Sequence, residues 1–214
     1  MSLKVRDVAA LIEKIGDVIE ENKEFLTELD AAIGDGDHGL NMNKGFKVVK
    51  DKMNSTNIKD IGELFKLVGL TLIATVGGAS GPLYGTAFMK GGMAVAGKTE
   101  VDMNDFIKIM DEAIKGIKMR GKAEAGDKTM IDALEPAFNA LKEGVLKELP
   151  AVDILKNARE AALNGVNYTK EIAARKGRAS YLGERSIGHQ DAGATSSFLM
   201  IDAIYEFVKD NTKC

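Results

Sequence analysis

Apolar residues recur at helical spacing along almost the whole chain, and this periodicity constrains the fold more than any other feature. The alternation of apolar and polar residues that marks a half-buried strand is not found in the sequence. The pattern predicts eight helices, at about 3–28, 40–54, 58–77, 82–96 and 103–120, from Thr129 onward, and at about 150–174 and 192–208. Pro136 is expected to kink the sixth helix or to delay its start.

The connections between these helices are mostly short, which predicts an all-α, antiparallel, up-and-down assembly. In such an assembly, successive loops alternate between the two ends of the molecule. The loops after even-numbered helices contain no motif that suggests a ligand or a reaction (54–57, 97–102 and 147–150). The loops after odd-numbered helices are rich in glycine and in polar residues (29–39, 77–82, 120–129 and 175–193). We therefore expect a single functional site at the end where these four loops meet.

The composition fits one globular domain over residues 1–214, because 45% hydrophobic residues are enough for a core of this size. A net charge of −3 and a pI of about 5.6 give no indication of nucleic-acid or membrane binding. The longest apolar run, 67–76, is too short to cross a bilayer. The charged N-terminus does not resemble a signal peptide, and the single cysteine, Cys214, forms no disulfide framework. These features favour a cytoplasmic location.

The first glycine-rich loop reads D-A-A-I-G-D-G-D-H-G at residues 30–39. Asp35 and Asp37 are separated by one glycine, so their carboxylates can converge, and Asp30 at the preceding helix end can join them. Three close carboxylates repel one another unless a cation lies between them. Oxygen ligands of this kind suit Mg²⁺ or Ca²⁺ rather than Zn²⁺. We interpret His38 as a donor to a bound anion; the alternative for the loop is an acidic turn of helix caps.

The second loop, G-G-A-S-G-P at residues 77–82, directly precedes a helix. Its glycines allow backbone N–H groups to approach an anion, and the helix N-terminus favours negative charge. The G-K-[ST] ending of a Walker A loop is missing. The alternative interpretation is a tight turn between helices that Ser80 caps.

The third and fourth loops predict different roles. In the third, we interpret Asp127 and Thr129 as helix caps, since Asp132 follows Thr129 at capping-box spacing. The fourth, 175–193, is long for a compact domain, and such loops are usually lids or binding loops. It contains Arg175, Lys176, Arg178, Arg185, His189 and Asp191. Arginine binds phosphate oxygens bidentately; the alternative, a solvated basic loop, applies more to Lys176 and Arg185 than to Arg178.

Metal-binding carboxylates, an anion-binding loop and a basic lid at one end fit Mg²⁺ that bridges phosphates. Phosphoryl transfer requires mainly positioning and charge neutralisation from the protein, and two metal ions could clamp the transferred group. The sequence offers no competing Ser-His-Asp or Cys-His constellation.

Four motifs carry a resemblance to a known family. They are D-A-A-I-G-D-G-D-H-G-x-N-M, G-G-A-S-G-P-L-Y-G-T-A-F, G-D-K-T-M-I-D-A-L and R-A-S-Y-L-G-E-R-S-x-G-H-x-D-A-G-A-T-S. In this order they resemble the nucleotide-binding L subunit of dihydroxyacetone kinase (DhaL), and the match covers nearly the whole chain. The resemblance implies an eight-helix antiparallel barrel with the nucleotide, ADP or ATP, at one end.

The resemblance also implies a set of site residues. Two Mg²⁺ ions would bind to Asp30, Asp35 and Asp37, which would act in catalysis through the metal, and Arg178 would stabilise phosphate. Nucleotide contacts would map to His38, Gly39, Leu40, Asn41, Ala79, Ser80, Gly121, Met130, Arg178, Asp191, Ala192 and Gly193. Leu40 stands at a variable position of the motif, so its contact is expected through the backbone.

The family has two branches. In one, the L domain is fused to a K domain and uses exchangeable ATP. In the other, a separate DhaK-type subunit holds dihydroxyacetone, the nucleotide remains on L as a coenzyme, and a DhaM-type protein of the phosphotransferase system rephosphorylates ADP from phosphoenolpyruvate. The chain carries no K domain, which favours the second branch.

Two other functions remain open from the sequence. The chain could be the L subunit of an ATP-dependent triose or tetrose kinase, or a non-catalytic Mg-nucleotide module that signals through partner binding. A metal-storage protein would not explain the basic lid. The sequence also leaves a homodimer open.

Overall fold

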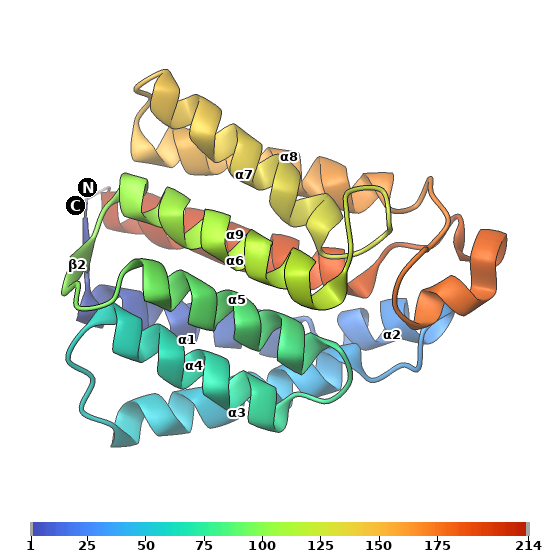
Figure 1. Ribbon diagram of the computed structural model, residues 1–214, viewed down its shortest axis with the longest axis horizontal. Helices are drawn as coiled ribbons and strands as arrows, with labels where there is room; N and C mark the ends of the chain where they lie inside the picture. Colours follow the sequence, from blue (N-terminus) through green and yellow to red (C-terminus); the bar gives the residue numbers. More distant parts are fainter. Residues whose placement is uncertain (1, 213–214) are drawn as a thin grey trace.

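The computed structural model describes residues 2–212, which are almost entirely helical (Figure 1). The helices are α1 (Val5–Glu21), α2 (Lys23–Ile33), α3 (His38–Ser55), α4 (Ile61–Thr75), α5 (Ser80–Ala94), α6 (Met103–Gly121), α7 (Ile131–Leu146), α8 (Ala151–Tyr168), the 3₁₀ segment η1 (Arg178–Ser186) and α9 (Ala192–Thr212). Two short strands, β1 (Leu3–Lys4) and β2 (Glu100–Val101), pair antiparallel with Leu3 opposite Val101. The predicted all-α class is confirmed, and Cys214 lies outside the described residues.

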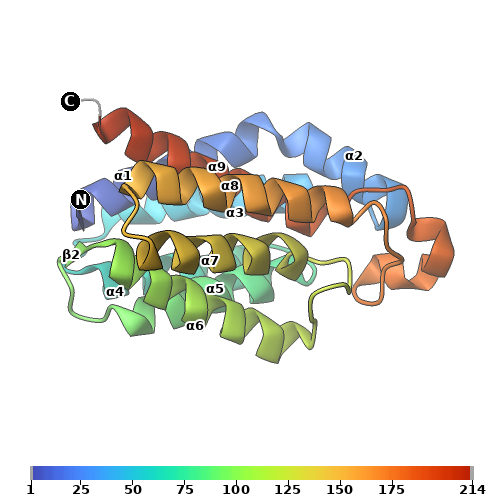
Figure 2. The ribbon, with the colours of Figure 1, turned by 90° about the horizontal axis from the view of Figure 1, so that it is seen from above.

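Eight of the α-helices form a closed ring. From α3 to α9 each helix packs against the next in the chain, and α1 closes the ring between α9 and α3. Neighbours run antiparallel, and α2 extends beyond the ring at one end, next to residues 175–190 (Figures 1 and 2). The predicted up-and-down barrel matches this ring. The start of α1, the end of α9 and the β1–β2 pair lie at the opposite end of the barrel (Figure 1).

The predicted helix at 3–28 is wrong in its bounds, because the chain forms two helices there. The break falls at Asn22, whose φ of −105° and ψ of 9° depart from helical values. The Asn22 side chain donates to the carbonyl of Val18 at 2.8 Å, and the backbone N–H of Asn22 donates to the same oxygen at 3.2 Å. The second helix, α2, then continues to Ile33, so Asp30 lies in its last turn, at the helix end where the sequence placed it.

Two further boundaries differ from the prediction. Helix α8 ends at Tyr168 rather than near residue 174. Pro136 lies inside α7 without delaying its start at Ile131. Since proline has no N–H, the carbonyl four residues earlier, on Asp132, loses its helical donor. Gly165 of α8 packs against this carbonyl so closely that a Cβ there would lie 1.9 Å from the oxygen.

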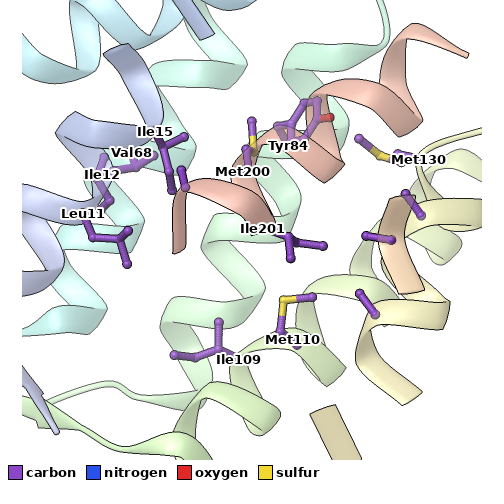
Figure 3. Close-up of a cluster of buried hydrophobic side chains, with 14 of the residues drawn as sticks. Leu11, Ile12, Ile15, Val68, Tyr84, Ile109, Met110, Met130, Met200 and Ile201 are labelled. Carbon is purple, nitrogen blue, oxygen red and sulfur yellow. The ribbon is translucent and has the colours of Figure 1, made fainter. Parts of the chain in front are cut away.

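The core follows directly from the helical periodicity. Figure 3 shows Leu11, Ile12 and Ile15 of α1 facing the barrel interior together with Val68 and Met200. An apolar cavity of about 190 Å³ remains inside the ring. Among the helices of residues 2–212, none is both long enough and apolar enough to span a membrane.

Candidate functional site

A cavity of about 380 Å³ opens at the end of the barrel where α2 and residues 175–190 lie. Each of the four loops that are rich in glycine and polar residues contributes to its wall. The contributing segments are 30–38, 77–83, 117–130 and 176–193. The prediction that these loops meet at one end is confirmed. Most of the site therefore comes from the loops and the helix turns beside them, while the barrel fixes their relative positions.

Three aspartates form an acidic cluster on this wall. Carboxylate oxygens of Asp30, Asp35 and Asp37 lie within 4.8 Å of one another. The Asp30 carboxylate accepts hydrogen bonds from the backbone N–H groups of Asp37 at 2.9 Å and His38 at 3.2 Å. Asp30 thus folds the turn that brings the other two carboxylates beside it. The spacing and the hard oxygen donors fit one or more divalent cations such as Mg²⁺.

Cationic side chains face the acidic cluster. Arg178 of η1 forms an ion pair with Asp35, with 2.9 Å between its Nε and Oδ2. Arg120 near the end of α6 and Lys176 before η1 also line the cavity. A cavity lined by three carboxylates and three cations suits a metal-bound anion better than a free cation or a free anion.

The starts of four helices also contribute to the wall. His38 begins α3, Ser80 begins α5 and Ala192 begins α9, while Met130 directly precedes α7. In an antiparallel ring these helices all begin at the same end. Their N-terminal backbone N–H groups and helix dipoles favour negative charge there. The backbone alone, through the direction of these helices, therefore favours a bound anion in this cavity.

His38 connects two of these helix starts. Its Nδ1 lies 3.0 Å from Ser80 Oγ, and its Nε2 lies 2.8 Å from Ser196 Oγ. Ser196 Oγ in turn lies 2.7 Å from the hydroxyl of Tyr84, whose pKa burial raises to about 12. Burial also lowers the pKa of His38, which favours the neutral ring. Because both ring nitrogens are engaged with serines, His38 orients the second loop rather than offering the free N–H donor that we expected.

Asp191 caps α9 at the cavity wall. Its carboxylate accepts from the backbone N–H of Ala194 at 2.7 Å. Removal of the carboxyl from bulk water raises the pKa of Asp191 to about 7, and the nearby Asp132 carboxylate acts in the same direction. Asp191 is therefore a carboxyl group whose charge changes near neutral pH.

The raised pKa predicts a pH-dependent cost of folding. Stability from protonated Asp191 is fully present below its ordinary pKa of about 3.9 and is lost as pH rises through about 7. The variant Asp191→Asn keeps an oxygen that can accept from Ala194 but does not titrate. We expect the unfolding free energy of the parent, relative to this variant, to fall by up to about 1.4 kcal/mol per pH unit across this window. Urea unfolding at several pH values, with EDTA and without nucleotide, measures the difference; a difference independent of pH would contradict the assignment.

Not every residue expected to bind nucleotide lies on the cavity wall. Gly39, Leu40 and Asn41 are not among the wall residues. Gly39 is where α3 packs on α2, since a Cβ there would lie 1.9 Å from the carbonyl oxygen of Lys23. Leu40 is 54% exposed. The other expected residues do line the cavity: His38, Ala79, Ser80, Gly121, Met130, Arg178, Asp191, Ala192 and Gly193.

The long fourth loop covers the cavity on one side and is more ordered than its glycine content indicates. Ala174, Ala179 and Leu182 pack against Ile33 of α2 in a small apolar cluster of their own. Tyr181, by contrast, is 88% exposed. We call residues 173–185, including most of η1, the lid.

Sequence reasoning missed three basic residues around this site. Arg120 was not selected, although it lines the cavity. Lys176 was assigned to solvent but lies on the wall. Lys128 was treated only as part of a capping segment, yet it is 1% exposed. Helical phase indicates that Arg120 shares a face with inward Ile117, whereas no local pattern marks Lys128 as buried.

Fold and site together define an all-α barrel with a carboxylate-lined, anion-favouring cavity at one end. Comparison with known proteins narrows this class. The DAK2 domain family matches residues 32–206. The PEP-dependent dihydroxyacetone kinase 1, ADP-binding subunit DhaL, of Listeria innocua is 45% identical over 195 residues, covering 91% of this chain and 92% of that protein. The PEP-dependent dihydroxyacetone kinase, ADP-binding subunit DhaL, of Escherichia coli K12 is 42% identical over 204 residues, covering 95% and 97%.

The chain belongs to the DAK2 domain family, and the resemblance to DhaL subunits is confirmed. The crystal structure of the dihydroxyacetone kinase of C. freundii in its native form shares the fold, with a TM-score of 0.74 and 26% identity. The match covers 93% of this chain but only 34% of that kinase, so this chain spans about a third of its length.

Proposed function

We propose that this chain is the nucleotide-binding, phosphoryl-transfer subunit of a dihydroxyacetone kinase. In this proposal Mg-ADP and Mg-ATP alternate on the subunit as a bound coenzyme. A DhaM-type protein, supplied from phosphoenolpyruvate, phosphorylates the ADP. The subunit then passes the phosphoryl group to dihydroxyacetone on a DhaK-type subunit. Phosphoenolpyruvate is a cytoplasmic metabolite, so the reaction belongs in the cytoplasm.

The observation that carries the proposal is the pairing of the acidic cluster with cations across one cavity. Asp30, Asp35 and Asp37 face Arg178, with Arg120 and Lys176 on the same wall. Neither group alone explains the other, whereas a metal-bound diphosphate satisfies both. The names of the Listeria and Escherichia relatives, which call them ADP-binding, support the same ligand.

The three aspartates would hold the metal, and we propose two Mg²⁺ ions there. Bound Mg²⁺ would supply positive charge that neutralises the phosphate groups. Within the chain, Asp30 keeps the turn closed by accepting two backbone hydrogen bonds. The carboxylates of Asp35 and Asp37 do not hold the turn in this way and would be available to the metal. Arg178 would exchange its pairing with Asp35 for phosphate oxygens when the metal takes that carboxylate.

The helix starts would hold the rest of the nucleotide. Ala79 and Ser80 at the start of α5, and Ala192 and Gly193 at the start of α9, line the cavity, and backbone N–H groups at these helix starts would bind an anion there. The neutral His38 keeps these two starts in register through Ser80 and Ser196. The lid covers the third side and limits escape, which a coenzyme that stays bound requires.

Reconstituted transfer tests the function. The purified chain is combined with a DhaK-type subunit, dihydroxyacetone, a DhaM-type protein with its phosphoenolpyruvate-dependent donors, and ADP in an amount no larger than the chain. We expect many turnovers of dihydroxyacetone phosphate per nucleotide, and none when the DhaK-type subunit is omitted.

The other outcomes separate the alternatives. Turnover only with excess ATP, and without the DhaM-type protein, would replace the proposal with an ATP-dependent triose or tetrose kinase subunit. Binding of Mg-ADP without turnover under either condition would indicate a non-catalytic module. Sedimentation of the free chain decides between a monomer and the homodimer that the sequence leaves open.

A further inference from the structure

Lys128 is a buried ammonium group that the proposed transfer does not use. It is 1% exposed, and its Nζ lies within hydrogen-bond distance of four backbone carbonyl oxygens. The distances are 2.6 Å to Thr169, 2.7 Å to Ser186, 2.6 Å to His189 and 3.2 Å to Ile172. An ammonium has three N–H groups, so it shares them among these oxygens. We call the four oxygens the carbonyl cage.

The carbonyl cage joins the two strands of chain that lead into and out of the lid. Thr169 and Ile172 precede the lid, whereas Ser186 and His189 follow it. Other bonds close the same neck: Gly188 N–H donates to the carbonyl of Lys170 at 2.7 Å, and Ala174 N–H donates to Ser186 Oγ at 2.8 Å. The lid is thus a loop with its ends held together, and the Lys128 charge lies at the centre of that closure.

Lys128 also fixes this neck relative to the barrel. It has a φ of 62°, a conformation that non-glycine residues adopt only when their surroundings hold them there. Next to it, the carbonyl of Asp127 accepts from Arg175 N–H at 3.0 Å. Two residues further on, Met130 lines the cavity immediately before α7. A shift of the neck would therefore move the lid relative to the helix starts that form the cavity.

We infer that Lys128 is a positioning residue, which closes the neck of the lid on the carbonyl cage and so places Arg178 over the acidic cluster. The inference depends on the proposed function in one respect: the ligand that the lid retains is taken to be a nucleotide. Removal of the ammonium would take this charged donor from four buried or partly buried carbonyl oxygens, and within residues 2–212 only the Ser186 oxygen would keep another protein donor, the His189 N–H at 3.4 Å. The neck would then open, and a bound nucleotide would escape faster.

The test measures release of a fluorescent ADP analogue, mant-ADP, from its Mg²⁺ complex with the full chain. Lys128→Ala should raise the dissociation rate by about tenfold or more, since charge-assisted hydrogen bonds are lost. Lys122→Ala is the matched control, because Lys122 lies in the same connection, at the C-terminal cap of α6, has a φ of 50° and is exposed. It should release mant-ADP at the parent rate.

Two further measurements separate positioning from a general loss of structure. Added n-propylammonium supplies the missing atoms of the Lys128→Ala side chain and should slow release again, whereas tetramethylammonium at equal ionic strength, which has no N–H, should not. In an Arg178→Ala background, Lys128→Ala should add little, because both changes act through one contact. Release at the parent rate, fully additive effects, or equal action of the two ammonium ions would each overturn the inference.

Hydrogen exchange measured without nucleotide tests the role of Lys128 independently of the proposed function. Exchange of the lid amides should rise in Lys128→Ala, with the α4 and α5 amides unchanged. Lys128→Met, which keeps the apolar stem, serves if Lys128→Ala does not fold. Failure of the parent to bind Mg-mant-ADP would overturn the proposed function, while lid exchange at the parent rate in the folded variant would overturn the role of Lys128.

Discussion

Asp35→Asn and Asp37→Asn should each weaken Mg²⁺-dependent ADP binding and abolish phosphoryl transfer, and neither should unfold the chain. Each substitution deletes one of three carboxylates that lie within 4.8 Å of one another, so the metal loses a charged ligand. With charge-assisted contacts worth about 1.5–3 kcal/mol, affinity for Mg-ADP should fall by roughly ten- to hundredfold or more. Calorimetric titration with Mg-ADP measures the loss.

The same substitutions should leave the metal-free fold intact. Removal of one of three like charges relieves repulsion, while Asp35→Asn also loses a partly exposed ion pair with Arg178 worth at most about 1 kcal/mol, so thermal unfolding in EDTA should change little. Asp30 is less suitable for this test because its carboxylate also closes the turn through two backbone N–H groups. Asp51→Asn, at an exposed position late in α3, is the control and should bind as the parent does. Normal Mg-ADP affinity in Asp35→Asn and Asp37→Asn would rule out the metal assignment.

Arg178→Ala should release ADP roughly ten- to hundredfold faster than the parent, because a charged hydrogen bond worth about 1.5–3 kcal/mol is lost. Arg178 lies on the cavity wall and reaches Asp35 across it. Stopped-flow displacement of mant-ADP gives the rate directly. Metal-free stability should change little, since a partly exposed ion pair contributes at most about 1 kcal/mol.

Arg185→Ala provides the matched control for the lid. Arg185 belongs to the same 3₁₀ segment, is exposed and is not among the wall residues. Its removal should leave the ADP release rate unchanged. In the parent, hydrogen exchange over residues 176–190 should fall when Mg-ADP binds. Two results together would contradict the lid: exchange over these residues that does not change when Mg-ADP binds, and release of ADP from Arg178→Ala at the parent rate. The segment would then be better interpreted as a partner interface.

The barrel and the location of the site could be predicted because both depend on local sequence patterns. Helical periodicity locates the helices, and antiparallel order then assigns alternate loops to one end. The break at Asn22 could not be predicted in this way, since neither proline nor glycine marks it and a side-chain hydrogen bond to Val18 stabilises it. Helix boundaries at Ile33 and Tyr168 depend on tertiary contacts for the same reason.

Individual site residues were predictable where their chemistry is local and unpredictable where it depends on distant partners. The acidic cluster falls within eight residues, so its convergence follows from the turn. The Lys128 ammonium binds carbonyl oxygens of residues 41 to 61 positions later in the sequence, and no local pattern around Lys128 predicts these contacts. Gly39 has a structural role that its motif does not reveal, since α3 packs there against the carbonyl of Lys23 on α2.

The central claim is that the cavity holds a magnesium nucleotide as a resident coenzyme. Native mass spectrometry of the chain, purified without added nucleotide, tests it most directly. The account predicts a species heavier than the polypeptide by one ADP and two Mg²⁺, which loses both on prolonged EDTA treatment and regains them with Mg-ADP. A polypeptide that carries no nucleotide as purified, and takes up none when Mg-ADP is added, would contradict it.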